Sequence, residues 1–175
     1  DYRIREGANI LAQNKQMFDA IRKRYGVPGE VLIAFWAFET DFGQVQGDFN
    51  TRNALLTLAH DCRRPDLFQP QVMAAIEMFR LGEFDLSTTG AWAGEIGMVQ
   101  MLPKDILERG VDGDGDGKID LKQSPKDAIA SVANFMKQHG WQTGMPISFP
   151  VQTNALSAAK DLADGEPKLK YTVQE

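Results

Sequence analysis

The 175-residue sequence is 43% hydrophobic and 25% charged, a balance typical of one globular domain with, at most, a small appendage. Its net charge of −5, without a basic cluster, argues against a nucleic-acid-binding protein, because nucleic acids require a concentrated positive surface. The single cysteine, Cys62, excludes an internal disulfide, and a chain of this length buries a core without one.

Membrane-spanning helices are not expected, because no apolar run approaches the roughly 20 residues that cross a bilayer. The longest run, residues 31–38, is far too short. The N-terminus, Asp1-Tyr2-Arg3, has neither an initiator Met nor a signal-peptide pattern. We therefore interpret the sequence as a mature or trimmed product, from which any export signal or lipid anchor has been removed.

Hydrophobic periodicity predicts a mainly α fold. Helices are expected at residues 4–25, 28–41, 53–60, 70–81 and 127–139, with a further helix opening at Pro103 and a loop at 83–92. Residues 31–38 are apolar on every face, which favours a helix in the centre of the fold over the alternative, a buried strand. The predicted domain is 1–141, including an acidic loop at 112–127, and 142–175 is a C-terminal tail with little periodicity.

Glu39 is the most informative position, because it directly follows this apolar run. Burial and the negative end of the helix dipole both raise the pKa of a carboxyl, as a general acid requires. The alternative is a helix-end glutamate that reaches solvent or pairs with an arginine. A conventional glycosidase needs a second carboxylate; Asp41 lies about 200° around the helix, and nothing marks the loop residue Asp48. The sequence thus offers one acid and no clear partner.

The segment Asp112-Gly113-Asp114-Gly115-Asp116-Gly117-Lys118-Ile119-Asp120 matches the start of an EF-hand calcium loop. Four carboxylates in so short a loop repel one another unless a cation neutralises them. Lys118 would contribute its backbone carbonyl. Gln123 stands where an EF-hand has its bidentate glutamate, so we expect Asp127 to close the site. The alternative is a solvated Asp/Gly turn.

Other polar residues give weaker indications. His60 and His139 lack zinc-type spacing, and Cys62 has no catalytic signature. The pair Arg63-Arg64 suits a carboxylate or an acetamido group, although a solvated pair is the default. The glycines of residues 90–97 would let the backbone approach a sugar.

The sequence resembles the B-type lytic murein transglycosylases over residues 25–141. The segments that carry the resemblance occur in the same order as in that family: Tyr25-Gly26-Val27-Pro28, Glu39-Thr40-Asp41-Phe42-Gly43, Ala54-Leu55-Leu56-Thr57-Leu58, Arg63-Arg64, Gly94-Glu95-Ile96-Gly97-Met98-Val99-Gln100-Met101-Leu102-Pro103, the acidic loop, Asp127-Ala128-Ile129, Ala133-Asn134-Phe135 and His139-Gly140-Trp141. Each segment alone is modest, but their joint order is specific.

The resemblance implies a lysozyme-like helical domain with an inserted EF-hand-like calcium loop and Glu39 as the sole catalytic acid/base. It implies substrate contacts from Gln100, Arg63, Arg64, Met101 and Phe135. It also implies a structural calcium ion held by Asp112, Asp114, Asp116, Lys118 and Asp127.

The expected reaction is cleavage, without water, of the β-1,4 bond between N-acetylmuramic acid and N-acetylglucosamine in peptidoglycan, leaving 1,6-anhydromuramic ends. The partners implied are glycan strands and other cell-wall enzymes. The location implied is the periplasm, with an outer-membrane anchor on a segment outside this sequence.

The sequence departs from the family in three places. Ala91 replaces a common serine, Phe135 replaces a common tyrosine, and nothing after Phe149 resembles the C-terminal segment that completes the cleft. The usual segment before the first helix is missing as well. A fragment, a reduced cleft and a cleft completed by a partner all remain open, as do a hydrolytic muramidase and a non-catalytic peptidoglycan-binding domain.

Overall fold

A computed structural model describes residues 2–148 of the chain. The chain divides into two compact units, Asp1–Thr143 and Gly144–Glu175. Only residues 144–148 of the second unit are described, so most of the expected tail lies outside the described residues. The predicted boundary after residue 141 stays a prediction.

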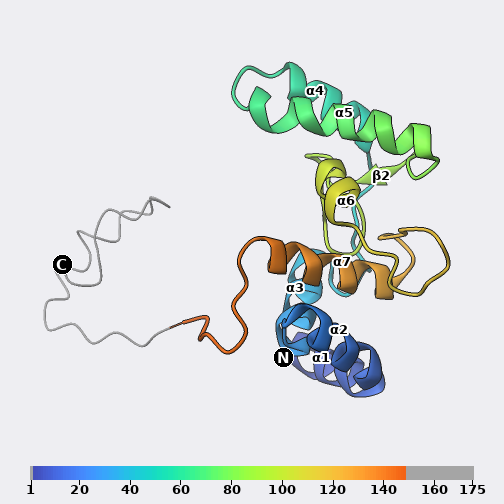
Figure 1. The fold of residues 1–175 in the computed structure, drawn as a ribbon. Coiled ribbons are helices and arrows are strands. Elements are labelled where there is room, and N and C mark those ends of the chain that lie inside the picture. The colour runs from blue at the N-terminus through green and yellow to red at the C-terminus, as the bar shows by residue number, and fades with distance from the viewer. Residues whose placement is uncertain (1, 149–175) are drawn as a thin grey trace, which may run out of the picture. The chain divides into compact units, whose positions relative to one another are not determined.

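The described chain is mainly helical, as the hydrophobic periodicity predicts (Figure 1). The elements follow in the order α1 (Tyr2–Gln13), α2 (Lys15–Tyr25), α3 (Gly29–Thr40), β1 (Phe49–Asn50), α4 (Thr51–His60), α5 (Pro65–Leu81), β2 (Thr89–Gly90), α6 (Pro103–Arg109) and α7 (Pro125–Gln138). None of the helices in residues 2–148 is long and apolar enough to cross a bilayer.

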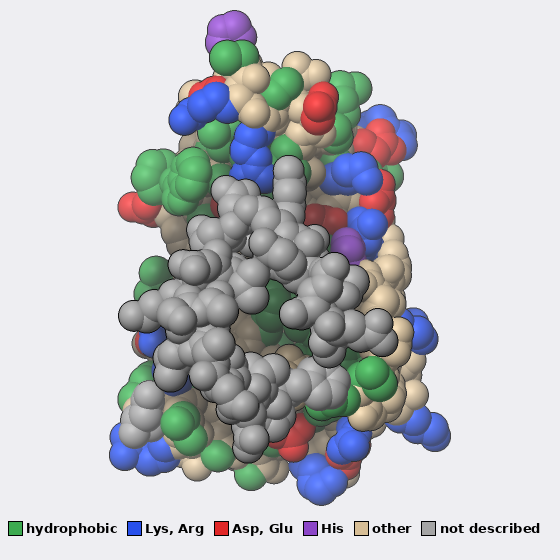
Figure 2. Space-filling model, turned by 90° about the vertical axis from the view of Figure 1, so that its left-hand side faces the viewer, with side chains coloured by type: hydrophobic (Ala, Val, Ile, Leu, Met, Phe, Trp, Pro, Cys, Tyr) green, Lys and Arg blue, Asp and Glu red, His purple; other side chains and the backbone are tan. Residues whose placement is uncertain are grey.

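Helices α4 and α5 pack side by side at one end of the first unit, and α1, α2 and α3 lie at the other end (Figure 1). Helices α6 and α7 join the two groups, because α6 contacts α5 and α7 contacts both α2 and α3. The hydrophobic core runs through this junction, with Leu32, Leu55 and Ile129 almost inaccessible to solvent. Where the described residues are visible in Figure 2, Lys and Arg side chains are interspersed with acidic and hydrophobic ones.

Two of the predicted helix boundaries are wrong. Residues 4–25 form two helices that separate at Asn14. The Asn14 side-chain amide and its backbone N–H both donate to the Ile10 carbonyl oxygen, at 2.9 and 3.0 Å. Helix α5 begins at Pro65 instead of Pro70, and Pro70 is accommodated inside it.

Helix α3 packs against the core on one face only, which corrects the expectation that all its faces are buried. Leu32, Ile33 and Trp36 lie in the core, whereas Phe38 is 79% exposed and Ala34 is also exposed. The exposed apolar face lines a groove with α1. The next residue, Glu39, is therefore on a surface of the unit and not in its interior.

The end of α3 is tied to the loop of residues 91–101 by one buried hydroxyl. Thr40 is 1% exposed, and its Oγ1 donates to the Met98 carbonyl oxygen at 2.6 Å. The same Oγ1 accepts a hydrogen bond from the Gly43 N–H at 2.9 Å. Within the loop, Ile96 and Met101 exchange two backbone hydrogen bonds. These bonds fix the loop against the end of the helix that carries Glu39.

Glycines at positions 90 and 97 allow close approach within the chain, and the approach of a sugar to residues 90–97 stays a prediction. A Cβ at Gly90, which pairs with Phe49 in the two-stranded sheet, would clash with the Glu95 carbonyl oxygen. Gly97 has a φ of 81°, and a Cβ there would clash with the Leu121 backbone. The backbone itself requires glycine at both positions.

We predict that Thr40→Val destabilises the fold by about 1–3 kcal/mol, because it leaves the buried Met98 carbonyl and Gly43 N–H without their partner. Thr40→Ser keeps the hydroxyl and is the matched control, so it should lose less. Urea unfolding of both variants measures the difference. Equal stabilities for the two variants would show that the hydroxyl is not what holds the loop.

Candidate active site

Glu39 lies in the last turn of α3, where the backbone leaves the helix abruptly. The next two residues after Thr40, Asp41 and Phe42, have left-handed φ values of 51° and 60°. Burial of the carboxyl raises the pKa of Glu39 above its ordinary value, and the negative charge of Glu95 raises that pKa further. The residue as a whole is exposed, so solvent limits the size of the effect. The predicted direction of the shift is confirmed.

Glu95 is a second carboxylate whose charge acts on Glu39, whereas the sequence alone indicated no clear partner. One of its oxygens, Oε2, is buried without a hydrogen-bond partner among residues 2–148. The two other acids considered from the sequence have different surroundings. Asp41 accepts a 3.0 Å hydrogen bond from Arg3, and Asp48 is exposed in a loop.

The sequence contained one signal for Glu95. It is the only charged residue in the otherwise small or apolar segment 90–99. Burying a carboxylate there is costly, so its presence requires an explanation. Helical periodicity does not help, because Glu95 lies on a loop far from Glu39 in sequence. A tertiary contact between Thr40 and Met98 brings the two segments together.

A cavity of about 430 Å³ lies between the α4–α5 connection and the 91–101 loop. Its wall includes Arg63 and Arg64 from the first segment and Trp92 and Glu95 from the second. Trp92 is 67% exposed. An exposed indole beside charged groups gives this cavity both an apolar platform and hydrogen-bonding groups, which suits an amphipathic ligand such as a sugar.

The two predicted arginines line the same cavity but have different neighbours. Arg63 binds the Asp61 carboxylate through Nε and Nη2, with a shortest distance of 2.6 Å, and these hydrogen bonds lower the pKa of Asp61 to about 2. The Arg64 guanidinium lies 6.0 Å from the centre of the Phe68 ring. Arg63 is thus largely neutralised by its own loop.

The other predicted substrate residues lie in three different settings. Gln100 has a φ of 50°, and its Nε2 donates to the Gly97 carbonyl oxygen at 2.8 Å, so it belongs to the same loop as Glu95. Met101 is only 6% exposed and packs in the core, which leaves little of it accessible to a sugar. Phe135 stacks on His139 with ring centres 4.1 Å apart.

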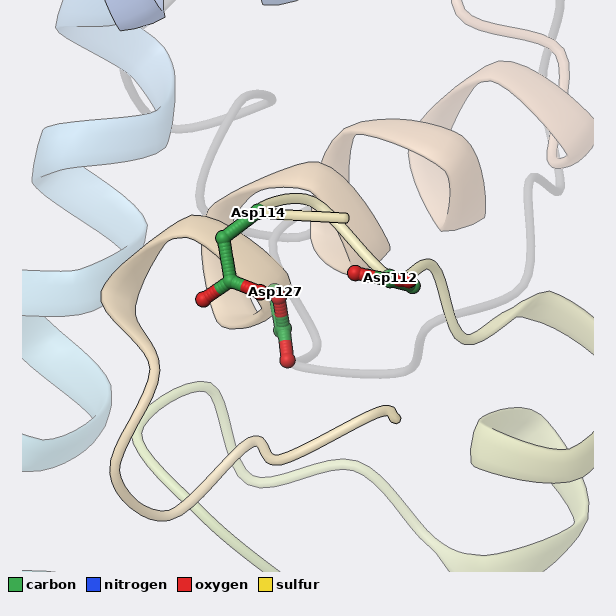
Figure 3. A group of neighbouring side chains, drawn as sticks. All are labelled: Asp112, Asp114 and Asp127. Carbon is green, nitrogen blue, oxygen red and sulfur yellow. The ribbon is translucent and has the colours of Figure 1, made fainter. Parts of the chain in front are cut away.

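Three of the predicted metal ligands gather in the acidic loop. Carboxylate oxygens of Asp112, Asp114 and Asp127 lie within 4.8 Å of one another (Figure 3). The Asp112 carboxylate accepts backbone hydrogen bonds from Gly117 and Gly115, which lower its pKa. Oxygen ligands at this spacing are the type that calcium prefers.

Asp127 also organises the loop. It is 1% exposed, and its two carboxylate oxygens accept hydrogen bonds from the Gly113 and Asp120 N–H groups, at 2.9 and 2.8 Å. The remaining predicted ligands lie outside the group of three. The Lys118 N–H donates to Asp116 Oδ1 at 2.9 Å, which closes a local turn. The structure therefore brings together three of the five predicted ligands.

A family model described as the transglycosylase SLT domain matches residues 1–174. The chain belongs to this family. The membership confirms the resemblance inferred from the sequence motifs. The match also extends beyond residues 25–141 in both directions, which corrects the expectation that the sequence after Phe149 does not resemble the family. The geometry around Glu39 does not identify a reaction by itself, and the family membership supplies one to propose.

Similar proteins agree with the family match. The chain is 36% identical to the membrane-bound lytic murein transglycosylase B of Escherichia coli over 174 residues, which is 98% of the chain and 46% of that protein. The chain thus spans less than half the length of this relative.

Solved structures show the same fold. SltB3 from Pseudomonas aeruginosa in complex with NAG-NAM-pentapeptide has a TM-score of 0.80 and 37% identity, covering 88% of this chain and 41% of that one. The Escherichia coli lytic transglycosylase SLT35 in complex with calcium has a TM-score of 0.78 and 33% identity, covering 83% and 47%. Because both identities exceed 30%, the likeness extends beyond the fold to the sequence.

Proposed function

We propose that this chain carries the catalytic site of a lytic transglycosylase. Its substrate is peptidoglycan, and it cleaves the β-1,4 bond between N-acetylmuramic acid and N-acetylglucosamine without adding water. The observation that carries the proposal is Glu39, a carboxyl with a raised pKa at the end of α3 in a chain of the transglycosylase SLT domain family.

The first step requires a protonated acid. Glu39 donates its proton to the bridging oxygen as the bond between that oxygen and C1 of the muramoyl sugar breaks. The oxygen leaves as the hydroxyl of N-acetylglucosamine, and the 2-acetamido group of the muramoyl sugar stabilises the positive charge at C1. Glu39 is left as a carboxylate.

The second step requires a base. The Glu39 carboxylate takes the proton of the muramoyl 6-hydroxyl while that oxygen forms a bond to C1, which closes the 1,6-anhydro ring. Glu39 thereby regains the proton that it gave in the first step. The enzyme returns to its starting state, and no water is consumed. A tethered hydroxyl has a high effective concentration, so this mechanism does not require a second carboxylate as a nucleophile.

The cavity and the relatives support a glycan substrate. Arg64 and Trp92 line the wall beside Glu95, and Gln100 belongs to the same loop. We assign substrate contacts to Gln100, Arg63 and Arg64, and weaker ones to Met101 and Phe135. The solved SltB3 structure holds NAG-NAM-pentapeptide, which is a fragment of the proposed polymer. Partners among other cell-wall enzymes, a periplasmic location and an outer-membrane anchor outside this chain belong to the same proposal.

Calcium fits the acidic loop. We assign Asp112, Asp114 and Asp127 as carboxylate ligands, because their oxygens already lie within 4.8 Å of one another, and Asp116 and Lys118 as ligands that approach on binding. The similar structure of SLT35 is in complex with calcium. The ion would neutralise the carboxylates and stabilise an EF-hand-like loop, and it takes no part in the chemistry.

We predict that Glu39→Gln reduces cleavage of purified sacculi by at least the roughly 10²–10⁴-fold ascribed to general acid–base catalysis, because Gln has no proton to give. Glu83→Gln, which removes an exposed carboxylate beyond α5, is the control and should keep full turnover. Retention of most turnover by folded Glu39→Gln would remove Glu39 from the mechanism.

The same variant tests the pKa shift through stability. A carboxyl whose folded pKa is raised binds more protons when folded, so stability falls as pH rises through the interval between the unfolded and folded pKa values. Glu39→Gln removes that loss. Its melting temperature should equal that of the wild type in acid and exceed it above the folded pKa of Glu39.

We predict that calcium raises the melting temperature and that a chelator lowers it. A ligand that binds only the folded state stabilises it by about 2.7 kcal/mol at a hundredfold excess over its dissociation constant. Asp112→Asn is the matched variant and should abolish most of the rise. An unchanged melting curve, together with no heat of binding in a calorimetric titration, would contradict the calcium assignment.

A further inference from the structure

The proposed mechanism leaves Glu95 without a role, although one of its carboxylate oxygens is buried without a hydrogen-bond partner among residues 2–148. The hydrogen bond from Thr40 to the Met98 carbonyl oxygen ties the loop of Glu95 to the end of α3, which carries Glu39. An unpaired charged group in a protein interior costs free energy, so its retention needs a reason. We propose that Glu95 is a positioning residue of this site, whose negative charge keeps the reactive proton on Glu39 until the glycosidic oxygen takes it. This inference rests on the proposed function of Glu39.

The backbone holds Glu95 in a defined place. Its carbonyl oxygen accepts a 2.9 Å hydrogen bond from the Ala91 N–H. Gly90 lies so close to that carbonyl that no side chain fits there. The Ile96–Met101 bridge follows directly. These contacts fix the backbone of Glu95 within the loop that Thr40 ties to the end of α3.

Several other charged side chains lie around the site, and most of them have partners of their own. Asp61 and Arg63 line the cavity but neutralise each other. Arg64 lines the same cavity, with its guanidinium over the Phe68 ring. Beyond the end of α3, Asp41 is paired with Arg3. Of these charged neighbours, Glu95 is the one whose field raises the pKa of Glu39.

A like charge helps both steps of the reaction. Before cleavage, it disfavours the ionised form of Glu39, so the acid stays loaded with its proton. After cleavage, Glu39 is a carboxylate beside another carboxylate, which makes it a stronger base toward the 6-hydroxyl. The same neighbour thus prepares Glu39 to give a proton and then to recover one.

The first test measures the proton on Glu39 directly and does not depend on turnover. In the whole 175-residue chain with ¹³C-labelled glutamate carboxyls, NMR titration gives the midpoint of Glu39, assigned by the signal that Glu39→Gln removes. Glu95→Gln should move this midpoint to lower pH. Glu95→Asp, which keeps the charge, should restore most of the wild-type value, and Glu83→Gln should leave it unchanged. An unmoved midpoint in Glu95→Gln overturns the proposal.

The second test follows the reaction itself. In the pH profile of kcat/KM on purified sacculi, the basic limb reports loss of the Glu39 proton, so Glu95→Gln should shift that limb to lower pH and leave the products unchanged. If the wild type released hydrolysed ends and Glu95→Gln selectively lost them, Glu95 would be a base that activates water. This result overturns the proposal.

The outcomes separate the two proposals. Suppose that the wild-type chain cleaves nothing, but that Glu95→Gln still moves the titration midpoint of Glu39 to lower pH. This result contradicts the proposed function and supports the electrostatic role of Glu95. If Glu95→Gln does not fold, Glu95→Ala removes the unpaired oxygen altogether and serves the same two measurements.

Discussion

The hydroxyl of Thr40 lies beside Glu39 in the chain and binds the Met98 carbonyl oxygen and the Gly43 N–H in a buried position. The rest of the site depends on this contact, because it joins the end of α3 to the loop that carries Glu95 and Gln100. Burial of the carboxyl raises the pKa of Glu39, and the negative charge of Glu95, which lies in this loop, raises it further.

The chemistry proposed for this site asks one carboxyl to act first as an acid and then as a base. A single residue can act as acid and as base only if both its protonated and its ionised form occur during the catalytic cycle. Partial burial alone would raise the pKa of Glu39 by penalising its charge. A neighbouring negative charge adds to that effect and can remain constant while sugars enter and leave the cavity. The acidic loop stabilises the fold separately, since Asp127 fastens it through Gly113 and Asp120.

Much of this account follows from local sequence. The apolar run before Glu39 and the boundaries at Pro28 and Gly82 predicted the helices, because periodicity and helix caps depend on neighbouring residues. The mainly helical class is confirmed. The break at Asn14 escaped prediction because apolar residues keep a helical spacing on both sides of it.

The features that escaped prediction at the site are tertiary. Periodicity did not reveal that Phe38 is exposed, because an apolar helix face without a neighbour looks the same in sequence as a buried one. Glu95 was visible only as an isolated charge in a glycine-rich segment, and its meaning depends on a contact across the fold. The sequence also did not reveal that Gly90 and Gly97 pack closely against Glu95 and Leu121 of the same chain.

The most direct test of the central claim, that Glu39 returns its proton through a tethered hydroxyl and not through water, is mass spectrometry of the fragments released from purified sacculi. The account predicts 1,6-anhydromuramic ends, about 18 mass units lighter than hydrolysed ends because no water is added. Reducing ends as the main product would contradict it and make the site that of a muramidase. Binding to sacculi without any released fragment would contradict it as well and leave a peptidoglycan-binding domain.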